Sequence, residues 1–154
     1  YKRDDVNREL FDDGWLKTGD LAYLVDGQMA MCGRIKDLII VGGRNVYPQD
    51  IERAVGGIDG IRAGNVIAFG SPGRSGKEQI VVVAETRADF QLDELRAEVN
   101  KRSIAAVGVP CREVVLVEPG TLPKTSSGKL QRALCQSQYT NGELELVEEP
   151  AAAG

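Results

Sequence analysis

Short apolar runs broken by turn residues predict β-structure in the first third of the chain. Residues 21–25 and 28–32 are both rich in β-favouring side chains, and the Asp26-Gly27 pair between them is typical of a two-residue type I′ turn. The pattern therefore predicts a β-hairpin. Residues 38–41 form a further apolar run that ends at Gly42-Gly43, and they predict a short buried strand.

The rest of the chain alternates between helical and strand periodicity. The expected helices are 48–55, 92–107 and 130–136, with a loop at 44–47 before the first of them, and the expected strands are 65–69, 79–85 and 113–117. Residues 80–84 are apolar at every position, so this strand should be covered on both faces. The order of elements predicts an α+β fold: an N-terminal β-hairpin followed by a small, largely antiparallel sheet flanked by helices.

Composition narrows the chemistry that the chain can perform. The 154 residues include no histidine, which argues against Ser-His-Asp triads, most zinc sites and the usual proton shuttle at neutral pH. The three cysteines are far apart and lack metal-ligand spacing, so we expect reduced thiols and no metal site. No apolar run approaches the roughly 20 residues that span a membrane. We therefore expect a cytoplasmic protein with no membrane span.

The net charge of −4 is concentrated at one end of the chain. Residues 138–154 carry four acidic side chains and no basic one, so residues 1–137 hold 19 charges of each sign. A balanced body with an acidic tail lacks the basic patch of a nucleic-acid-binding protein. The tail itself is rich in Ala and Glu, which predicts disorder.

A polar loop at 122–132, with the sequence LPKTSSGKLQR, combines one proline, three short hydroxyl side chains and Gly128 before Lys129. These residue types favour a tight, ordered turn, and a lysine ammonium beside a glycine suits the binding of a phosphate or carboxylate. A Walker phosphate loop would need a glycine at Pro123 and a Ser or Thr at Leu130, so that motif is absent. The second candidate, residues 70–78, has one residue too many between its glycines.

Three other polar features interrupt structural runs of the sequence. They are Thr18-Gly19-Asp20, residues 33–37 (GRIKD) and residues 42–45 (GGRN). Taken singly, each has an ordinary structural explanation: a turn residue, a solvated group of charges, or a tight bend. Lys129 taken alone would be a solvated surface lysine.

Together, in this order, these features resemble the closing signatures of the adenylate-forming ligases: acyl-CoA synthetases, luciferases and peptide-synthetase adenylation domains. The matching motifs are WLKTGD, GRIKDLII and LPKTSSGK, and the resemblance covers residues 14–137. It implies that 1–33 is the end of a large N-terminal domain with its linker and hairpin, that 34–137 is a mobile C-terminal lid, and that 138–154 is an acidic tail. The chain would then be a fragment, inactive alone, of an ATP-dependent acid ligase.

The resemblance also assigns roles to individual residues. It implies that Lys129 is the catalytic lysine, which bridges the acyl carboxylate and the α-phosphate of ATP. Asp20 would bind the ribose hydroxyls of ATP, and Arg34 the ribose or phosphates. Lys36 would be the hinge between two lid orientations. Magnesium would be bound through ATP, mainly in the large domain.

The sequences GGRNVYPQDIE and IRAGNV look most like those of fatty-acyl-AMP ligases, which activate a fatty acid and pass it to an acyl carrier protein or polyketide synthase. Gly42 and Gly43 would let the phosphopantetheine arm of the acceptor pass. One alternative is an acyl-CoA or aryl-CoA ligase. A non-enzymatic alternative is an interaction module whose acidic tail recruits a basic partner.

Overall fold

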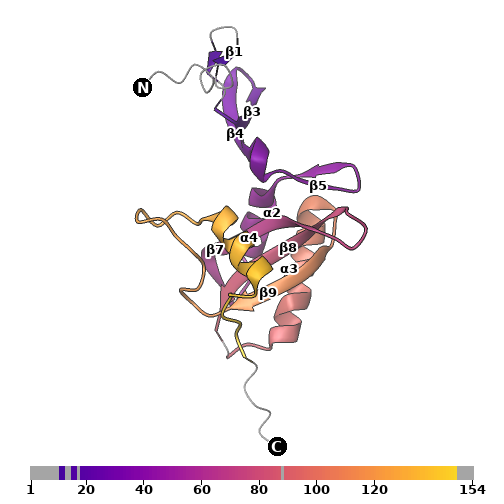
Figure 1. The fold of residues 1–154 in the computed structure, drawn as a ribbon, viewed down its shortest axis with the longest axis vertical. Helices are drawn as coiled ribbons and strands as arrows, with labels where there is room; N and C mark the ends of the chain where they lie inside the picture. The colour runs from indigo at the N-terminus through magenta and orange to yellow at the C-terminus, as the bar shows by residue number, and fades with distance from the viewer. Residues whose placement is uncertain (1–10, 13–14, 17, 88, 149–154) are drawn as a thin grey trace, which may run out of the picture. The chain divides into compact units, whose positions relative to one another are not determined.

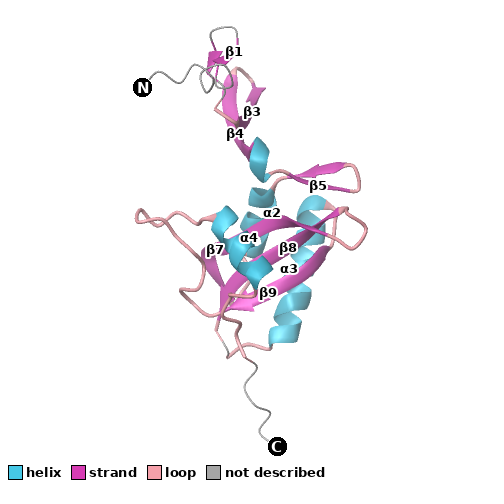
Figure 2. Cartoon of the chain, viewed as in Figure 1, coloured by secondary structure: helices cyan, strands magenta, loops and turns pink. Residues whose placement is uncertain are grey.

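The computed structural model describes residues 11–12, 15–16, 18–87 and 89–148 of the chain. These residues belong to two compact units, Tyr1–Asp37 and Leu38–Gly154, which we call unit 1 and unit 2. Figure 1 shows the ribbon coloured along the chain, and Figure 2 shows the helices and strands. Residues 1–10 of the expected N-terminal segment lie outside the described part.

Unit 1 consists of two strand pairs. The strands β1 (Phe11–Asp12) and β2 (Trp15–Leu16) pair with each other, and β3 (Asp20–Val25) pairs in antiparallel fashion with β4 (Gln28–Arg34). Asp26 has φ 50° and Gly27 has φ 77°, and a type I′ turn requires positive φ at both positions. The predicted hairpin is therefore confirmed. A 3₁₀ turn, η1 (Ile35–Asp37), ends the unit.

Unit 2 begins with a second hairpin, formed by β5 (Ile39–Val41) and β6 (Arg44–Val46). Gly42 and Gly43, both with positive φ, form the turn. The sequence pattern predicted a loop where β6 lies and a short buried strand where β5 lies. Instead the hairpin is covered on one side, because Ile39 is buried while Ile40 remains 56% exposed.

The body of unit 2 is a three-stranded sheet in the order β7 (Ile61–Pro72), β8 (Glu78–Thr86) and β9 (Cys111–Val117). β7 and β8 are antiparallel, whereas β8 and β9 are parallel because α3 (Leu92–Val107) provides the crossover between them. With α2 (Pro48–Val55) and α4 (Arg132–Asn141), the unit is α+β. The predicted fold class is confirmed.

Alternate residues of the central strand β8 face two separate hydrophobic cores. Ile80, Val82 and Ala84 pack with residues of α2 and α3, while Val81 and Val83 pack with Cys135 of α4. The strand period of two explains this division, and it confirms that β8 is covered on both faces. The helices therefore lie on both sides of the sheet, with α4 in front of it in Figure 1.

The C-terminal segment is more ordered than the sequence indicated. α4 includes residues 138–141, and Val147 is 4% exposed and donates its N–H to the carbonyl of Leu116 at 3.0 Å. The burial of Val147 and its backbone hydrogen bond to β9 fix the position of this segment, although the segment is acidic. Residues 149–154 lie outside the described part. Among the described helices, none is both long and apolar enough to cross a membrane.

Candidate functional site

The segment around Lys129 forms a tight turn with its own hydrogen bonds. The N–H of Thr125 donates to the carbonyl of Lys129 at 2.8 Å, and the N–H of Gly128 donates to the carbonyl of Thr125 at 2.9 Å. The Thr125 hydroxyl accepts the N–H of Lys129 at 3.1 Å and contacts the Ser127 hydroxyl at 3.0 Å. Gly128 has φ 84°, which most side chains avoid. The predicted ordered loop is therefore present.

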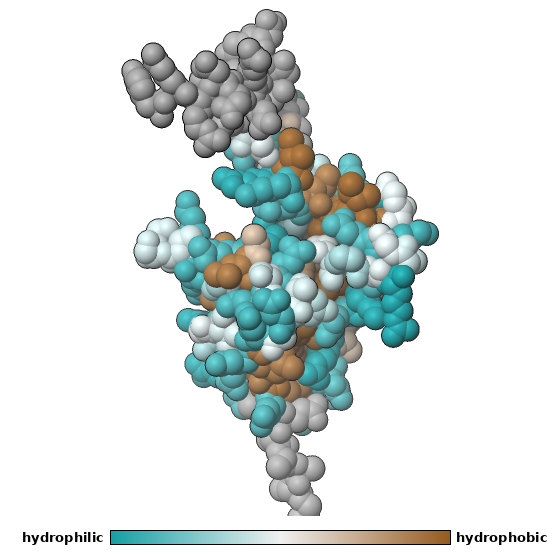
Figure 3. All heavy atoms as spheres, in the orientation of Figure 1, coloured by the Kyte–Doolittle hydropathy of each residue, from teal (hydrophilic) through white to brown (hydrophobic). Residues whose placement is uncertain are grey.

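The lysine loop, residues 121–131, presents Lys129 to solvent. The loop projects from the body of unit 2 (Figure 1), and its surface is mainly polar (Figure 3). Lys129 is exposed, and no ion pair of its ammonium is present among the residues that the structure describes. An exposed cation on a structured turn can meet an anion without first giving up a partner inside the protein.

A buried carboxylate holds the start of the lysine loop. Glu85 is 0% exposed, and its Oε1 accepts the N–H of Leu122 at 3.1 Å. Its Oε2 accepts a hydrogen bond from Arg62 Nη1 at 2.9 Å. Because Glu85 shares the β8 face of Val81 and Val83, strand periodicity directs it toward the side of the sheet where the loop begins.

A second ion pair holds the end of the loop. Arg132 Nη2 lies 2.8 Å from Glu52 Oε1, and both side chains are only 19% exposed. Arg132 Nε donates to the carbonyl of Ala68 at 3.0 Å, while Glu52 Oε1 accepts the N–H of Ala68 at 3.0 Å. The pair therefore satisfies both backbone groups of Ala68 on β7, an edge strand of the sheet.

Cys135 lies beneath this ion pair on α4. Burial raises the pKa of the Cys135 thiol to about 12, with the positive charge of Arg132 opposing the shift and the negative charge of Glu52 adding to it. A thiol with so high a pKa remains protonated at neutral pH and is a poor nucleophile. Cys135 therefore acts as an apolar core residue.

Asp20 and Arg34 lie side by side in unit 1. The two residues are paired across the β3–β4 ladder, and Arg34 Nε lies 3.5 Å from Asp20 Oδ1. Their side chains are 58% (Arg34) and 31% (Asp20) exposed, so both can reach a ligand. The carboxylate can accept hydrogen bonds from hydroxyl groups of a ligand. The guanidinium beside it can donate hydrogen bonds to phosphate oxygens.

Lys36 follows within the 3₁₀ turn of unit 1, at residues 35–37. The N–H of Ile35 donates to the carbonyl of Gly19 at 2.9 Å, so the start of this turn is tied to the base of the hairpin. Lys36 is exposed. It lies two residues before the first residue of unit 2.

Gly42 and Gly43 form the tip of the β5–β6 hairpin, with φ of 56° and 77°. No heavy atom lies within 4 Å of a Cβ placed at either glycine, so the tip is open. The hairpin is held at the middle of β5, where Glu78 Oε2 accepts the N–H of Ile40 at 2.8 Å. Apolar surface is exposed around this hairpin in Figure 3.

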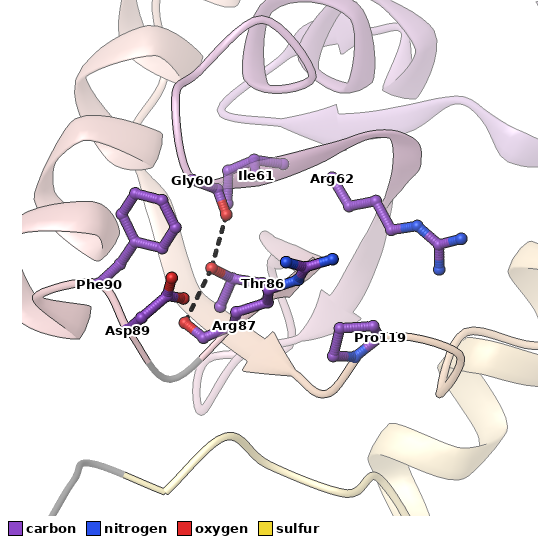
Figure 4. A pocket seen from close by; sticks show the side chains of 8 residues that line it. All are labelled: Gly60, Ile61, Arg62, Thr86, Arg87, Asp89, Phe90 and Pro119. Atoms are coloured by element: carbon purple, nitrogen blue, oxygen red, sulfur yellow. Dashed lines mark hydrogen bonds between the residues drawn. The ribbon is translucent and has the colours of Figure 1, made fainter.

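A separate pocket of about 500 Å³ lies at the far end of β8 (Figure 4). Arg62 on β7 and Arg87, the residue after β8, both line it, and the Thr86 hydroxyl donates to the carbonyl of Gly60 at 2.6 Å. None of the six residues that the sequence assigned to the site lines this pocket. The described residues also contain no cluster of three side chains suited to hold a metal ion.

Comparison with known proteins identifies the family of this chain. The family model for the AMP-binding enzyme C-terminal domain matches residues 43–135, a range that includes the whole lysine loop. The chain belongs to this family. Its relatives bear names such as fatty-acid–CoA ligase and long-chain-fatty-acid–AMP ligase, so the resemblance to adenylate-forming enzymes is confirmed.

Two curated relatives come from Mycobacterium tuberculosis. The chain is 45% identical over 126 residues to Putative ligase Rv1013, covering 79% of this chain and 23% of the relative. It is 38% identical over 142 residues to Long-chain-fatty-acid–AMP ligase FadD28, covering 87% of this chain and 24% of the relative. The chain thus spans about a quarter of the length of these relatives.

Solved structures show the same fold. One comes from studies of fatty acyl-adenylate ligases from E. coli and L. pneumophila; it has a TM-score of 0.71 and 36% identity, covering 91% of this chain and 24% of that chain. Another is McyG A-PCP complexed with phenylalanyl-adenylate, with a TM-score of 0.77 and 26% identity over 92% of this chain and 26% of that chain.

The sequence analysis named exposed residues as candidate site residues of this AMP-binding C-terminal domain. It did not name the residues that hold the lysine loop in place. Glu85 ends an otherwise apolar strand run, and such a charge at the end of a buried strand was an available signal. Glu52 gave no comparable signal, because its partner Arg132 lies 80 positions away. Only the packing of α2 and α4 around β7 brings the two together.

Proposed function

We propose that this chain is the C-terminal domain of a fatty-acyl-AMP ligase, which activates a fatty acid with ATP to an acyl-adenylate and releases pyrophosphate. The proposal follows from the family, from relatives named as fatty-acid ligases, and from the chain spanning about a quarter of their length. The remaining length would form the large domain that binds the substrates. On this proposal the chain does not turn over by itself.

The observation that carries the proposal is the presentation of Lys129. The side chain is solvent-exposed at the end of a turn closed by hydrogen bonds, on a loop that projects from the body of unit 2 (Figure 1). The two ends of this loop are held from the body of the unit, by Glu85 at Leu122 and by Glu52 at Arg132. Such support suits a lysine that is delivered to a site on another domain, because a defined backbone limits the positions of the ammonium.

The chemistry gives Lys129 a specific task. A carboxylate oxygen of the fatty acid attacks the α-phosphorus of ATP, and the bond from that phosphorus to the bridging oxygen of pyrophosphate breaks. Two anions must approach, and one cation about 4 Å away contributes roughly 4 kcal/mol at an effective dielectric constant near 20. A positioned ammonium therefore favours both the approach and the transition state.

Asp20 and Arg34 fit the binding of ATP on the proposed site. The Asp20 carboxylate offers two acceptor oxygens for the two ribose hydroxyls, and Arg34 beside it can donate to the ribose or to phosphate. Their exposure and their 3.5 Å separation support such a shared role. Magnesium bound to ATP would neutralise phosphate charge, and on this proposal it is held through ATP, mainly in the large domain.

Lys36 is proposed as the hinge between residues 1–33, which continue from the large domain, and a mobile lid that begins at residue 34. Its place beside the division at Asp37 and Leu38 supports this assignment. Rotation there would present Lys129 during adenylation and withdraw it afterwards. Lys36→Pro should restrict the backbone and impair one half-reaction more than the other. Equal loss in both, measured separately, would remove the hinge assignment.

The acceptor is proposed to be the phosphopantetheine arm of an acyl carrier protein or polyketide synthase, with Gly42 and Gly43 beside its path. The open tip of the β5–β6 hairpin supports this part, because no atom lies within 4 Å of a Cβ added at either glycine. One similar structure holds an adenylation domain with a carrier domain, as its name A-PCP states. The relative named as an AMP ligase also agrees.

An acyl-CoA ligase is the second candidate, because other relatives are named fatty-acid–CoA ligase and acyl-CoA synthetase. The complete enzyme should be supplied with fatty acid, ATP and either coenzyme A or phosphopantetheinylated carrier protein. We expect product on the carrier protein and release of acyl-adenylate without coenzyme A ester. Efficient formation of acyl-coenzyme A would favour the second candidate instead.

The central test is Lys129→Ala in the complete enzyme, measured by fatty-acid-dependent exchange between ATP and pyrophosphate. We expect exchange to fall about 10²–10³-fold, the scale for losing one preorganised electrostatic contact. Exchange at the wild-type rate would count decisively against the proposed role. Loss of exchange with intact transfer of acyl groups from added acyl-adenylate would place the defect in adenylation.

A further inference from the structure

The lysine loop is internally ordered but joins the body of unit 2 only at its ends. Its base is closed by the N–H of Gln131, which donates to the carbonyl of Pro123 at 2.9 Å, and by one bridge between Lys124 and Leu130. These contacts fix the shape of the loop. They do not fix its orientation on the sheet, which depends on the residues at its two ends.

One end is set by Glu85, which holds the N–H of Leu122 as described above. At the other end, Leu130 packs against the hydrophobic core that contains Cys135. Apolar packing has no fixed direction, so it does not by itself set the orientation of the loop. The second fixed point is Arg132, the first residue of α4 and the third residue after Lys129. Its guanidinium donates Nε to the Ala68 carbonyl and Nη2 to Glu52, so the planar group is held in two directions.

Stability alone does not account for this arrangement. A half-buried or buried ion pair adds little net stability, because desolvation offsets most of the attraction. What the pair supplies is geometry: it connects α2, the edge strand β7 and the start of α4 through one backbone position, Ala68. Arg132, which makes the contact with Ala68, follows Lys129 by only three residues.

We infer that Arg132 and Glu52 are positioning residues for Lys129, and this inference rests on the proposed function. They act on the reaction by fixing where the lysine loop leaves the body of the lid, without touching substrate. A displacement of about 1 Å in a reacting group can cost about 10²-fold in rate. The pair should therefore matter for adenylation, which needs Lys129, and much less for acyl transfer, which does not.

The experiment compares Arg132→Lys and Glu52→Gln with Arg102→Lys in the complete enzyme. A lysine at 132 keeps the charge but cannot reproduce the fork that joins Ala68 to Glu52. The control removes the same group from another Arg–Glu pair, in which Arg102 Nε lies 2.9 Å from Glu98 Oε1 on the exposed side of α3. Adenylation is measured by pyrophosphate exchange, and transfer by supplying preformed acyl-adenylate.

We expect Arg132→Lys and Glu52→Gln to lower kcat of adenylation about 10–100-fold, with KM for ATP and the rate of acyl transfer within about twofold of wild type. Arg102→Lys should leave both half-reactions within about twofold. Equal losses in both half-reactions, or adenylation within twofold of wild type, would overturn the inference. A merely structural role would produce equal losses.

Two further measurements separate the possible failures. Lys129→Ala is assayed in parallel: if it leaves adenylation unchanged, the proposed function fails, whereas its expected loss beside a normal Arg132→Lys variant refutes only the positioning role. If Arg132→Lys does not fold, Glu52→Gln carries the test together with native trypsin cleavage after Lys129. We expect that cleavage to be about tenfold faster than in wild type, and an unchanged cleavage rate with unchanged adenylation would overturn the inference.

Discussion

Two turns of unit 2 have nearly the same backbone but different surroundings. In residues 73–77, between β7 and β8, the N–H of Gly73 donates to the carbonyl of Lys77 at 2.8 Å, and the N–H of Gly76 to the carbonyl of Gly73 at 3.0 Å. The same two bonds occur in residues 125–129, at 2.8 and 2.9 Å. Each turn ends in Ser-Gly-Lys, with φ near +80° at the glycine.

The surroundings of the two turns explain why only one is a candidate for catalysis. The first caps a β-ladder, because Pro72 pairs directly with Glu78, and its sequence is accounted for by chain reversal. The second caps a loop outside the sheet, and side chains from β8 and α2 hold its ends. The two turns project in opposite directions in the view of Figure 1. A local motif therefore does not identify a functional lysine by itself.

The largest expected difference is between Lys129→Ala and Lys77→Ala. Both lysines are exposed at the same place in the same kind of turn. We expect the first variant to lower pyrophosphate exchange about 10²–10³-fold and the second to change it less than about twofold. Similar rates for the two variants would mean that the surroundings of the lysine loop do not distinguish it.

A smaller difference is expected between Gly128→Ala and Gly76→Ala. Both glycines have positive φ, and no atom lies within 4 Å of an added Cβ at either one, so the strain should be similar at roughly 1–2 kcal/mol. Thermal unfolding should therefore show comparable losses of stability. Only Gly128→Ala should also lower adenylation, by about tenfold, because it distorts the turn that carries Lys129. Equal adenylation in the two variants would contradict this expectation.

A further effect, confined to alkaline pH, is expected in the helix that supports the lysine loop. Burial raises the pKa of Cys135 from 9.0 to about 12, so the unfolded chain loses this proton first as the pH rises. The contribution of the protonated thiol to the free energy of unfolding is complete below pH 9 and is lost as the pH rises from 9 to about 12.

The measurement is the thermal unfolding midpoint of the 154-residue chain, followed by circular dichroism between pH 7 and 11. Cys135→Ala should lower the midpoint at pH 7 through lost packing, and its midpoint should then fall less steeply above pH 9 than that of wild type. Parallel pH profiles for the two proteins would show that Cys135 does not titrate as described.

Local rules were sufficient for most of the elements. Asp26-Gly27 predicted the first hairpin, Pro48 and Gly108 marked helix ends, and the apolar run at 80–84 predicted a strand covered on both faces. β6 was missed because a three-residue strand around Asn45 has no apolar period of its own. The order found at Val147 was missed because a single buried valine gives no periodic signal.

The sequence by itself determined the turn at Asp26-Gly27, the bounds of α2 and α3 and the exposed lysine turn, because glycine, proline and short hydroxyl residues act on their immediate neighbours. Only the tertiary structure decided how that turn is held. Glu85 and Leu122 are 37 positions apart, and Glu52 and Arg132 are 80 apart. Contacts at such separations depend on which faces of the sheet and helices meet, and no local pattern encodes that.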